Sequence, residues 1–177
     1  MTYYRRIIDQ KLLEWKDSPR RKPLLIRGAR QVGKSSAVRQ FGKCFKYFVE
    51  INLERKPSIR QLFTKDIDVK RTCEGISATL GIPILPGETL LFIDEIQVSQ
   101  EAIMSLRYFK EDYPELHVIA AGSLLEFTLE ELPSFGVGRI RSLYMYPFSF
   151  DEFLLAQGKD LTLDYKHKAT SDSPVPE

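Results

Sequence analysis

Apolar residues along this chain follow two different spacings. Short continuous apolar runs at 24–26 and 90–93 are typical of strands that are buried on both faces of a parallel sheet. Between such runs, apolar residues recur every three or four positions, as on the buried side of an amphipathic helix. The pattern predicts strands over 24–26, 45–53, 90–93, 116–121 and 140–146, and helices over 3–17, 34–41, 57–80 (one or two), 102–113 and 150–156. This alternation predicts an α/β fold, a parallel sheet with helices on both faces.

The end of the chain has a different composition. Residues 158–177 are mostly polar and finish in Ser-Asp-Ser-Pro-Val-Pro-Glu, with too little apolar material to fold alone. We therefore expect one domain over 1–157, with the helix at 3–17 as its N-terminal extension. Residues 158–177 are expected to be a disordered polar tail or the start of a missing C-terminal domain.

Composition excludes several classes of protein. The 177 residues are 43% hydrophobic and 28% charged, as in an ordinary globular domain, and the net charge of +2 does not indicate a wholesale polyanion binder. Two cysteines and two histidines are too few for a disulfide scaffold or a His-rich metal site. No apolar run is long enough for a signal peptide or a membrane span, so a cytoplasmic protein without a membrane partner is expected.

The most specific motif lies directly after the first apolar run. Residues 28–35, Gly-Ala-Arg-Gln-Val-Gly-Lys-Ser, match the phosphate-binding loop pattern G-x-x-x-x-G-K-[ST] at every position. Its glycines allow backbone amides to approach phosphate oxygens, its lysine can reach the β- and γ-phosphates, and its serine can ligate Mg²⁺. A glycine-rich surface loop is the alternative. The predicted nucleotide-binding residues are Gly28, Ala29, Arg30, Gln31, Val32, Gly33, Lys34, Ser35 and Ser36.

A second motif ends the apolar run at 90–93. Asp94 and Glu95 follow it directly, which fits a Walker-B strand whose aspartate holds the Mg²⁺ shell together with Ser35. Glu95 is then placed to orient and deprotonate the attacking water. Solvated acids at a strand end are the alternative, which the presence of both motifs disfavours.

Four further residues have two interpretations each. Ser123, at the end of the strand over 116–121, could sense the γ-phosphate or cap a following helix, and both roles could coexist. Arg139 could contact nucleotide in its own or a neighbouring subunit, or be a solvated loop arginine. Arg30 could face solvent or a partner, and Gln97 could position water or lie on the surface.

These motifs, together with Gly-Arg at 138–139 and Tyr-Pro-Phe-Ser-Phe-Asp-Glu-Phe at 146–153, resemble the AAA-like ATPase domain of a broad group of prokaryotic ATP-binding proteins. The resemblance covers Tyr3 to about Gln157. It implies a P-loop NTPase fold of about five parallel strands, a three-layer sandwich in which the Walker-B strand does not neighbour the phosphate-loop strand. It also implies Mg²⁺-dependent ATP hydrolysis, with catalytic duties for Lys34, Glu95 and Ser123. An uncharacterised C-terminal domain usually follows in that group, so self-association or a protein partner through that region stays open.

Other functions are less well supported by the sequence. The residue three positions after Asp94 is Gln97, where a GTPase would have glycine, and no Asn-Lys-x-Asp guanine-binding motif is present. A P-loop small-molecule kinase and a non-hydrolysing nucleotide-dependent interaction module stay open. Nucleic-acid binding through basic residues near the N-terminus competes with a simpler explanation, an amphipathic helix with solvated charges. Those residues are Arg5, Arg6, Arg20, Arg21 and Lys22, with Tyr3, Tyr4 and Trp15 nearby.

Overall fold

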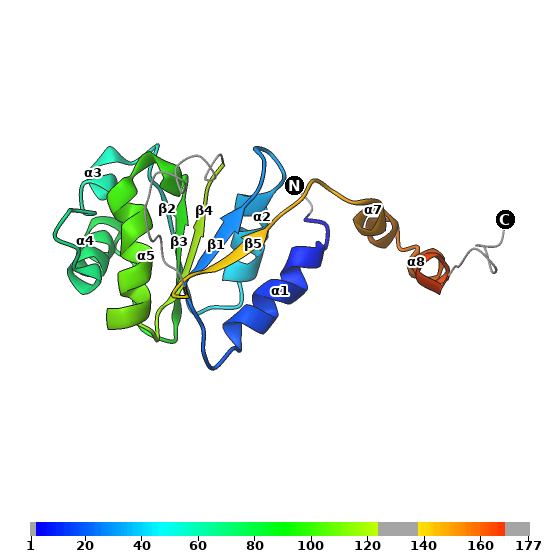
Figure 1. Cartoon of the computed structure of the whole chain (residues 1–177), viewed down its shortest axis with the longest axis horizontal. Coiled ribbons are helices and arrows are strands. Elements are labelled where there is room, and N and C mark those ends of the chain that lie inside the picture. The colour runs from blue at the N-terminus through cyan, green and yellow to red at the C-terminus, as the bar shows by residue number, and fades with distance from the viewer. Residues whose placement is uncertain (1–2, 124–137, 169–177) are drawn as a thin grey trace.

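In the computed structural model, which describes residues 3–123 and 138–168, five strands form one sheet in the order β2-β3-β4-β1-β5 (Figure 1). All of the pairings are parallel. The strands are β1 Leu24–Arg27, β2 Tyr47–Asn52, β3 Thr89–Asp94, β4 His117–Ala121 and β5 Arg141–Tyr144. Because β4 lies between β1 and β3, the strand with the Walker-B pattern does not neighbour the phosphate-loop strand, as the family resemblance implied.

Helices cover the sheet in two layers, so the predicted three-layer α/β sandwich is confirmed (Figure 1). One core cluster joins α4 and α5 to one face, with Ile51, Leu91 and Val118 among the strand residues. The other joins α1 and α2 to the opposite face through Ile26, Phe92 and others. The helices are α1 Ile7–Lys16, α2 Lys34–Gly42, α3 Pro57–Arg60, α4 Val69–Leu80, η1 Ile96–Val98, α5 Gln100–Asp112, α7 Phe150–Ala156 and α8 Asp160–Lys168.

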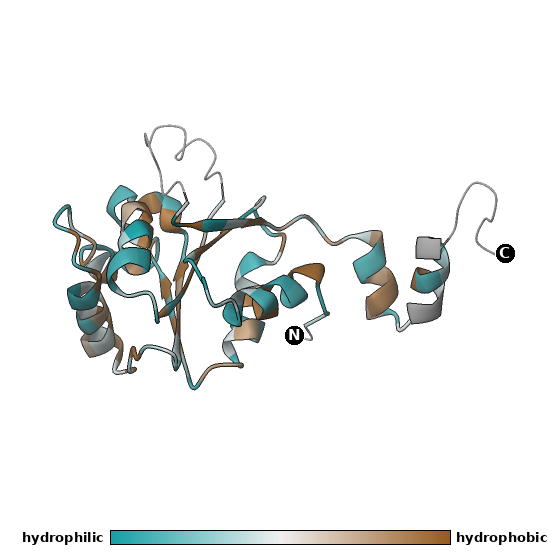
Figure 2. Cartoon of the chain, turned by 60° about the horizontal axis from the view of Figure 1, so that its bottom comes forward, coloured by the Kyte–Doolittle hydropathy of each residue, from teal (hydrophilic) through white to brown (hydrophobic). Residues whose placement is uncertain are grey.

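Local sequence sets the ends of several helices. The Asp68 carboxylate accepts hydrogen bonds from two backbone amides at the start of α4, which ends at Gly81 with a φ of 66°. Ser149 and Glu152 form a capping box at the start of α7. Figure 2 shows hydrophobic residues concentrated along the strands and hydrophilic ones on the outer sides of the helices.

Several sequence predictions are revised, including the strand over 45–53, which is Tyr47–Asn52, and the helix over 102–113, which is Gln100–Asp112. The N-terminal helix was expected over 3–17 but is confined to Ile7–Lys16, because residues 3–5 precede its N-cap. The last strand is Arg141–Tyr144 rather than 140–146. Helix α8 occupies Asp160–Lys168, inside the segment expected to be a disordered tail. Residues 169–177 of that segment lie outside the described residues.

Within the described ranges, no helix is both long and apolar enough to span a membrane.

Candidate functional site

A cleft of about 870 Å³ opens at the edge of the sheet where the strands end. Because all strands run parallel, the segments that follow β1, β2, β3 and β4 meet at this edge. Both motifs of the sequence therefore converge there. The lining residues are Arg30, Gln31, Gly33, Lys34, Ser35, Ser36, Arg39, Glu50, Asn52, Glu54, Arg55, Asp94, Glu95, Gln97, Val98 and Ser123.

The loop between β1 and α2 has the unusual backbone that its glycines predict. Gly28 and Gly33 have φ values of 142° and 97°, and Gln31 also lies in the left-handed region with a φ of 63°. A Cβ on Gly28 would lie 2.2 Å from the backbone oxygen of Met145. This glycine is therefore required for close packing against the segment after β5, whereas the sequence interpretation assigned it to the phosphate.

The loop residues divide between the cleft and the core. Six of the nine predicted nucleotide-binding residues line the cleft, while Gly28, Ala29 and Val32 do not. Val32 packs against the core beneath α1 and α2. The backbone carbonyls of Gly28 and Ala29 instead accept hydrogen bonds from within the loop.

Lys34 donates those bonds. Its Nζ lies 2.8 Å from the oxygen of Gly28 and 2.7 Å from that of Ala29. Burial lowers the pKa of Lys34, although the nearby carboxylates of Glu95 and Asp94 oppose the shift. The side chain thus lies folded back over its own loop, within the field of the Walker-B acids.

Ser35 and Asp94, the two predicted metal ligands, are in contact. The Ser35 hydroxyl donates to Oδ2 of Asp94 over 2.9 Å, and the Asp94 side chain is almost completely buried. Burial raises the pKa of Asp94; the Ser35 hydrogen bond opposes this rise, and the charge of Glu95 adds to it. Oxygen ligands of this kind suit Mg²⁺, which typically binds one or two protein groups together with substrate phosphates and water. Among the described residues no group of three or more His, Cys, Asp and Glu could hold a metal.

Glu95 lies at the turn that follows β3. Its φ of 53° is rare for a residue other than glycine, and it directs the chain from the buried strand into η1. The side-chain amide Nε2 of Gln97 donates to Oε2 of Glu95 over 2.6 Å. Gln97 is half-buried and lines the cleft.

Ser123 and Arg30 also meet in the cleft. Ser123 is buried at the end of β4, and Nε of Arg30 lies 3.4 Å from its hydroxyl oxygen. The helix that Ser123 might cap falls in 124–137, outside the described residues. Ser123 therefore lies where contact with a terminal phosphate is feasible.

The structure does not bring Arg139 to this cleft. Its guanidinium pairs with Glu111 in the last turn of α5, and it precedes β5. Residues that precede a parallel strand lie at the opposite edge from those that follow one. Arg139 therefore lies at the opposite edge of the sheet from the cleft of its own chain, while a contact with a nucleotide in a neighbouring subunit stays a prediction.

The outer wall of the cleft was missed from the sequence. Glu50 and Asn52 come from the last residues of β2, and Asn52 is in register with Asp94 on β3. Arg39 on α2 holds Glu50 through two close contacts, Nε to Oε2 at 2.8 Å and Nη2 to Oε1 at 2.7 Å. These residues could have been found from the predicted strand over 45–53. Because the sheet was predicted to be parallel, the carboxyl end of that strand had to lie at the same edge as the two motifs.

Two of the five basic N-terminal residues, Arg6 and Arg21, are engaged within the protein, whereas Arg5 and Arg20 are exposed. Trp15 is fully buried, Arg6 is 9% exposed, and Arg21 donates to the backbone oxygens of Lys16 and Glu115. This arrangement favours the helix-packing explanation over a nucleic-acid surface.

Comparison with known proteins adds one positive finding. A family model described as an AAA domain matches residues 20–154, most of the chain. A search of curated proteins gives no match.

Proposed function

The chain belongs to the AAA domain family, and on that premise we propose that it binds ATP together with Mg²⁺ and hydrolyses it. A nucleotide-binding, ATPase-like function follows from the family. The observation that supports hydrolysis is that Lys34, Ser35, Asp94 and Glu95, from two separate motifs, line one cleft.

Binding would depend on the loop and on Lys34. Backbone amides of the loop and the start of α2 provide donors for the phosphates, and the helix dipole adds positive potential. Lys34 would exchange its bonds to the carbonyls of Gly28 and Ala29 for phosphate oxygens. Ser35 and Asp94 would hold Mg²⁺, whose chemistry is to neutralise charge on the phosphate oxygens.

Hydrolysis requires a proton acceptor beside the γ-phosphate. We assign this to Glu95, which would take one proton from a water molecule. The water oxygen forms a bond to the γ-phosphorus, and the bond from that phosphorus to the β–γ bridging oxygen breaks, which yields ADP and phosphate. Gln97 holds one oxygen of Glu95 and leaves the other available for the water.

The direct test measures ATP affinity and phosphate release with and without Mg²⁺. Lys34→Ala should remove measurable nucleotide binding, because it deletes the main charge that faces the terminal phosphates. Glu95→Gln should keep ATP affinity and slow phosphate release by about 10²- to 10⁴-fold, the usual contribution of a general base. Glu74→Gln, on the exposed side of α4, is the matched control and should behave as wild type.

Each alternative function predicts a different result. Wild-type turnover in Glu95→Gln would refute the role of Glu95. ATP binding without phosphate release in the wild type would indicate an interaction module. Transfer of the γ-phosphate to an acceptor other than water would indicate a kinase.

A further inference from the structure

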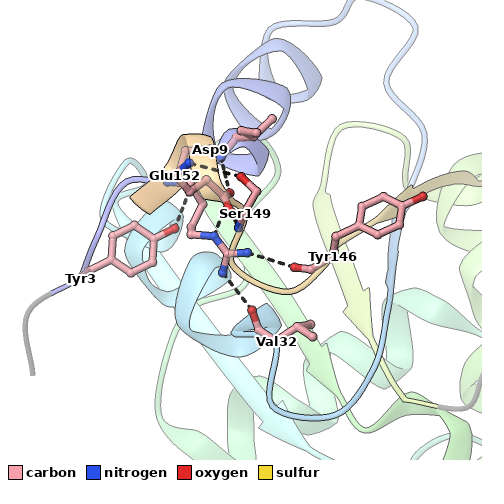
Figure 3. A network of polar contacts seen from close by, with 8 residues as sticks. Tyr3, Asp9, Val32, Tyr146, Ser149 and Glu152 are labelled. Atoms are coloured by element: carbon pink, nitrogen blue, oxygen red, sulfur yellow. Dashed lines mark hydrogen bonds and ion pairs between the residues drawn. The ribbon is translucent and has the colours of Figure 1, made fainter. Parts of the chain in front are cut away.

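Arg6 joins three segments that are far apart in the sequence. Its Nε donates to Oε1 of Glu152 on α7 over 2.8 Å. Its Nη1 donates to the backbone oxygen of Val32 in the phosphate loop over 2.9 Å, and its Nη2 to that of Tyr146 over 3.0 Å. Figure 3 shows Val32, Tyr146 and Glu152 converging on this point. The residue that precedes α1 thus contacts the loop between β1 and α2 directly.

This guanidinium is held rigidly. Glu152 is itself fixed by the backbone amides of Ile7 and Ser149, at 2.9 Å and 2.8 Å. The Phe148 ring lies over the guanidinium, 5.1 Å from ring centroid to Cζ. Each of the three guanidinium nitrogens donates one hydrogen bond, and a lysine ammonium cannot reproduce this planar set of donors.

The bond to Val32 determines how the next amide is directed. The peptide unit between Val32 and Gly33 is planar and trans, so its C=O and N–H point in opposite directions. The carbonyl of Val32 points to Arg6, and the N–H of Gly33 must therefore point away from Arg6. Gly33 lines the cleft, so this direction leads toward the site assigned to the phosphates.

We propose that Arg6 is a positioning residue for the phosphate loop: by holding the carbonyl of Val32, it directs the amide of Gly33 into the nucleotide cleft. This inference rests on the proposed function. It predicts that Arg6 affects nucleotide affinity through the loop, whereas a residue that merely ties α1 to α7 would affect only folding stability.

The test compares nucleotide affinity with stability in a set of variants. Arg6→Lys keeps the positive charge but loses the planar guanidinium and its set of donors. The dissociation constants of ADP and ATP should therefore rise about tenfold. The phosphate-release rate at saturating ATP should stay within about twofold of wild type, because Arg6 does not touch the reacting atoms. Arg5→Met, an exposed neighbour, should leave both quantities unchanged.

Two further measurements separate positioning from general stability. Ile76→Val, a core substitution on α4 far from the loop, should lower the melting temperature without changing nucleotide affinity. The ¹H shift of the Gly33 amide on addition of ADP should be smaller in Arg6→Lys than in wild type. If Arg6→Lys does not fold, Glu152→Gln replaces it, with an expected loss of affinity of about threefold.

The outcomes distinguish the two proposals. A wild-type protein that binds no nucleotide overturns the proposed function and this inference together. A wild type that binds, with an Arg6→Lys variant within about twofold of its affinity, overturns only the role of Arg6. An unchanged response of the Gly33 amide in Arg6→Lys has the same consequence.

Discussion

Asp94 shows at the residue scale how the site differs from the rest of the core. Its carboxylate is 5% exposed at the end of a fully buried strand, and another carboxylate follows immediately at Glu95. Burial and this neighbouring charge raise the pKa of Asp94, and the hydrogen bond from Ser35 offsets only part of the rise. Burying the ionised Asp94 carboxylate therefore costs folding free energy, and a bound cation would reduce that cost.

Replacement of Asp94 by Asn should therefore separate stability from function. A raised pKa means that the folded state holds its proton more tightly, so stability falls as the pH rises from the unfolded value through the folded value. Without metal, Asp94→Asn should be as stable as wild type or more stable by about 1 kcal/mol. Its ATP binding should no longer respond to Mg²⁺.

Urea unfolding in EDTA and ATP titration with added Mg²⁺ measure the two effects. Asp66→Asn, at an exposed position before α4, serves as control and should change neither. A clear loss of stability in metal-free Asp94→Asn would contradict this account of the site.

At the scale of elements, periodicity predicted most of the fold because the three central strands, β1, β3 and β4, are buried on both faces. The apolar runs at 24–26 and 90–93 coincide with the centres of β1 and β3, and α7 begins and ends where its sequence pattern did. The boundaries of β5 were wrong because it is an edge strand whose residues are largely exposed, so it has little apolar pattern. Helix α8 was missed because its sequence, Asp-Leu-Thr-Leu-Asp-Tyr-Lys-His-Lys, is mostly polar.

The sequence predicted the residues of the site only where they belong to one continuous motif. The phosphate loop and the Walker-B acids are continuous in sequence, and both line the cleft. The Arg6 contact to Val32 and the Arg39 contact to Glu50 join different elements, so they depend on how the elements pack. The sequence could not decide between the two interpretations of Arg139 for the same reason: only the strand direction shows that it lies at the far edge of the sheet.

His117, the first residue of β4, links that strand to α1. It is buried, with its ring 5.9 Å from that of Trp15 and 4.8 Å from that of Phe45 between centroids. Burial, and then the charges of Arg21 and Lys16, lower its pKa from 6.5 to about 4. The folded protein thus keeps His117 neutral where the unfolded chain would bind a proton.

Stability should consequently fall as the pH drops from 6.5 to about 4. For this group alone the loss should be up to about 3 kcal/mol over the interval, because the unfolded state binds one more proton there. His117→Phe, which preserves an aromatic ring between Trp15 and Phe45, should lose less stability than wild type across that interval. Urea unfolding at several pH values measures both curves, and parallel curves would show that His117 does not contribute.

At the scale of the whole molecule, segments from both ends of the chain hold the phosphate loop. Arg6 precedes α1, and Glu152 lies on α7 after the last strand. Burial alone would raise the pKa of Glu152, but hydrogen bonds from Arg6, Ser149 and Ile7 outweigh it, and the pKa is lowered. Helix α8 packs on α7 instead, where Lys166 pairs with Asp151 and lies over the Phe150 ring.

This arrangement predicts different outcomes for two shortened chains. A chain of residues 1–157 lacks α8, which contributes no residue to either core cluster in the described structure, so its unfolding free energy should stay within about 0.5 kcal/mol of the full chain. A chain of residues 1–148 also loses α7 and leaves Arg6 without Glu152. Removing one partner of a buried ion pair costs about 3–5 kcal/mol, and the lower end is expected because water would then reach Arg6. Urea unfolding of all three chains measures these free energies. Equal losses of unfolding free energy in the two shortened chains would place the boundary of the folded domain after α8. An unchanged unfolding free energy in residues 1–148 would show that Glu152 does not stabilise the buried Arg6.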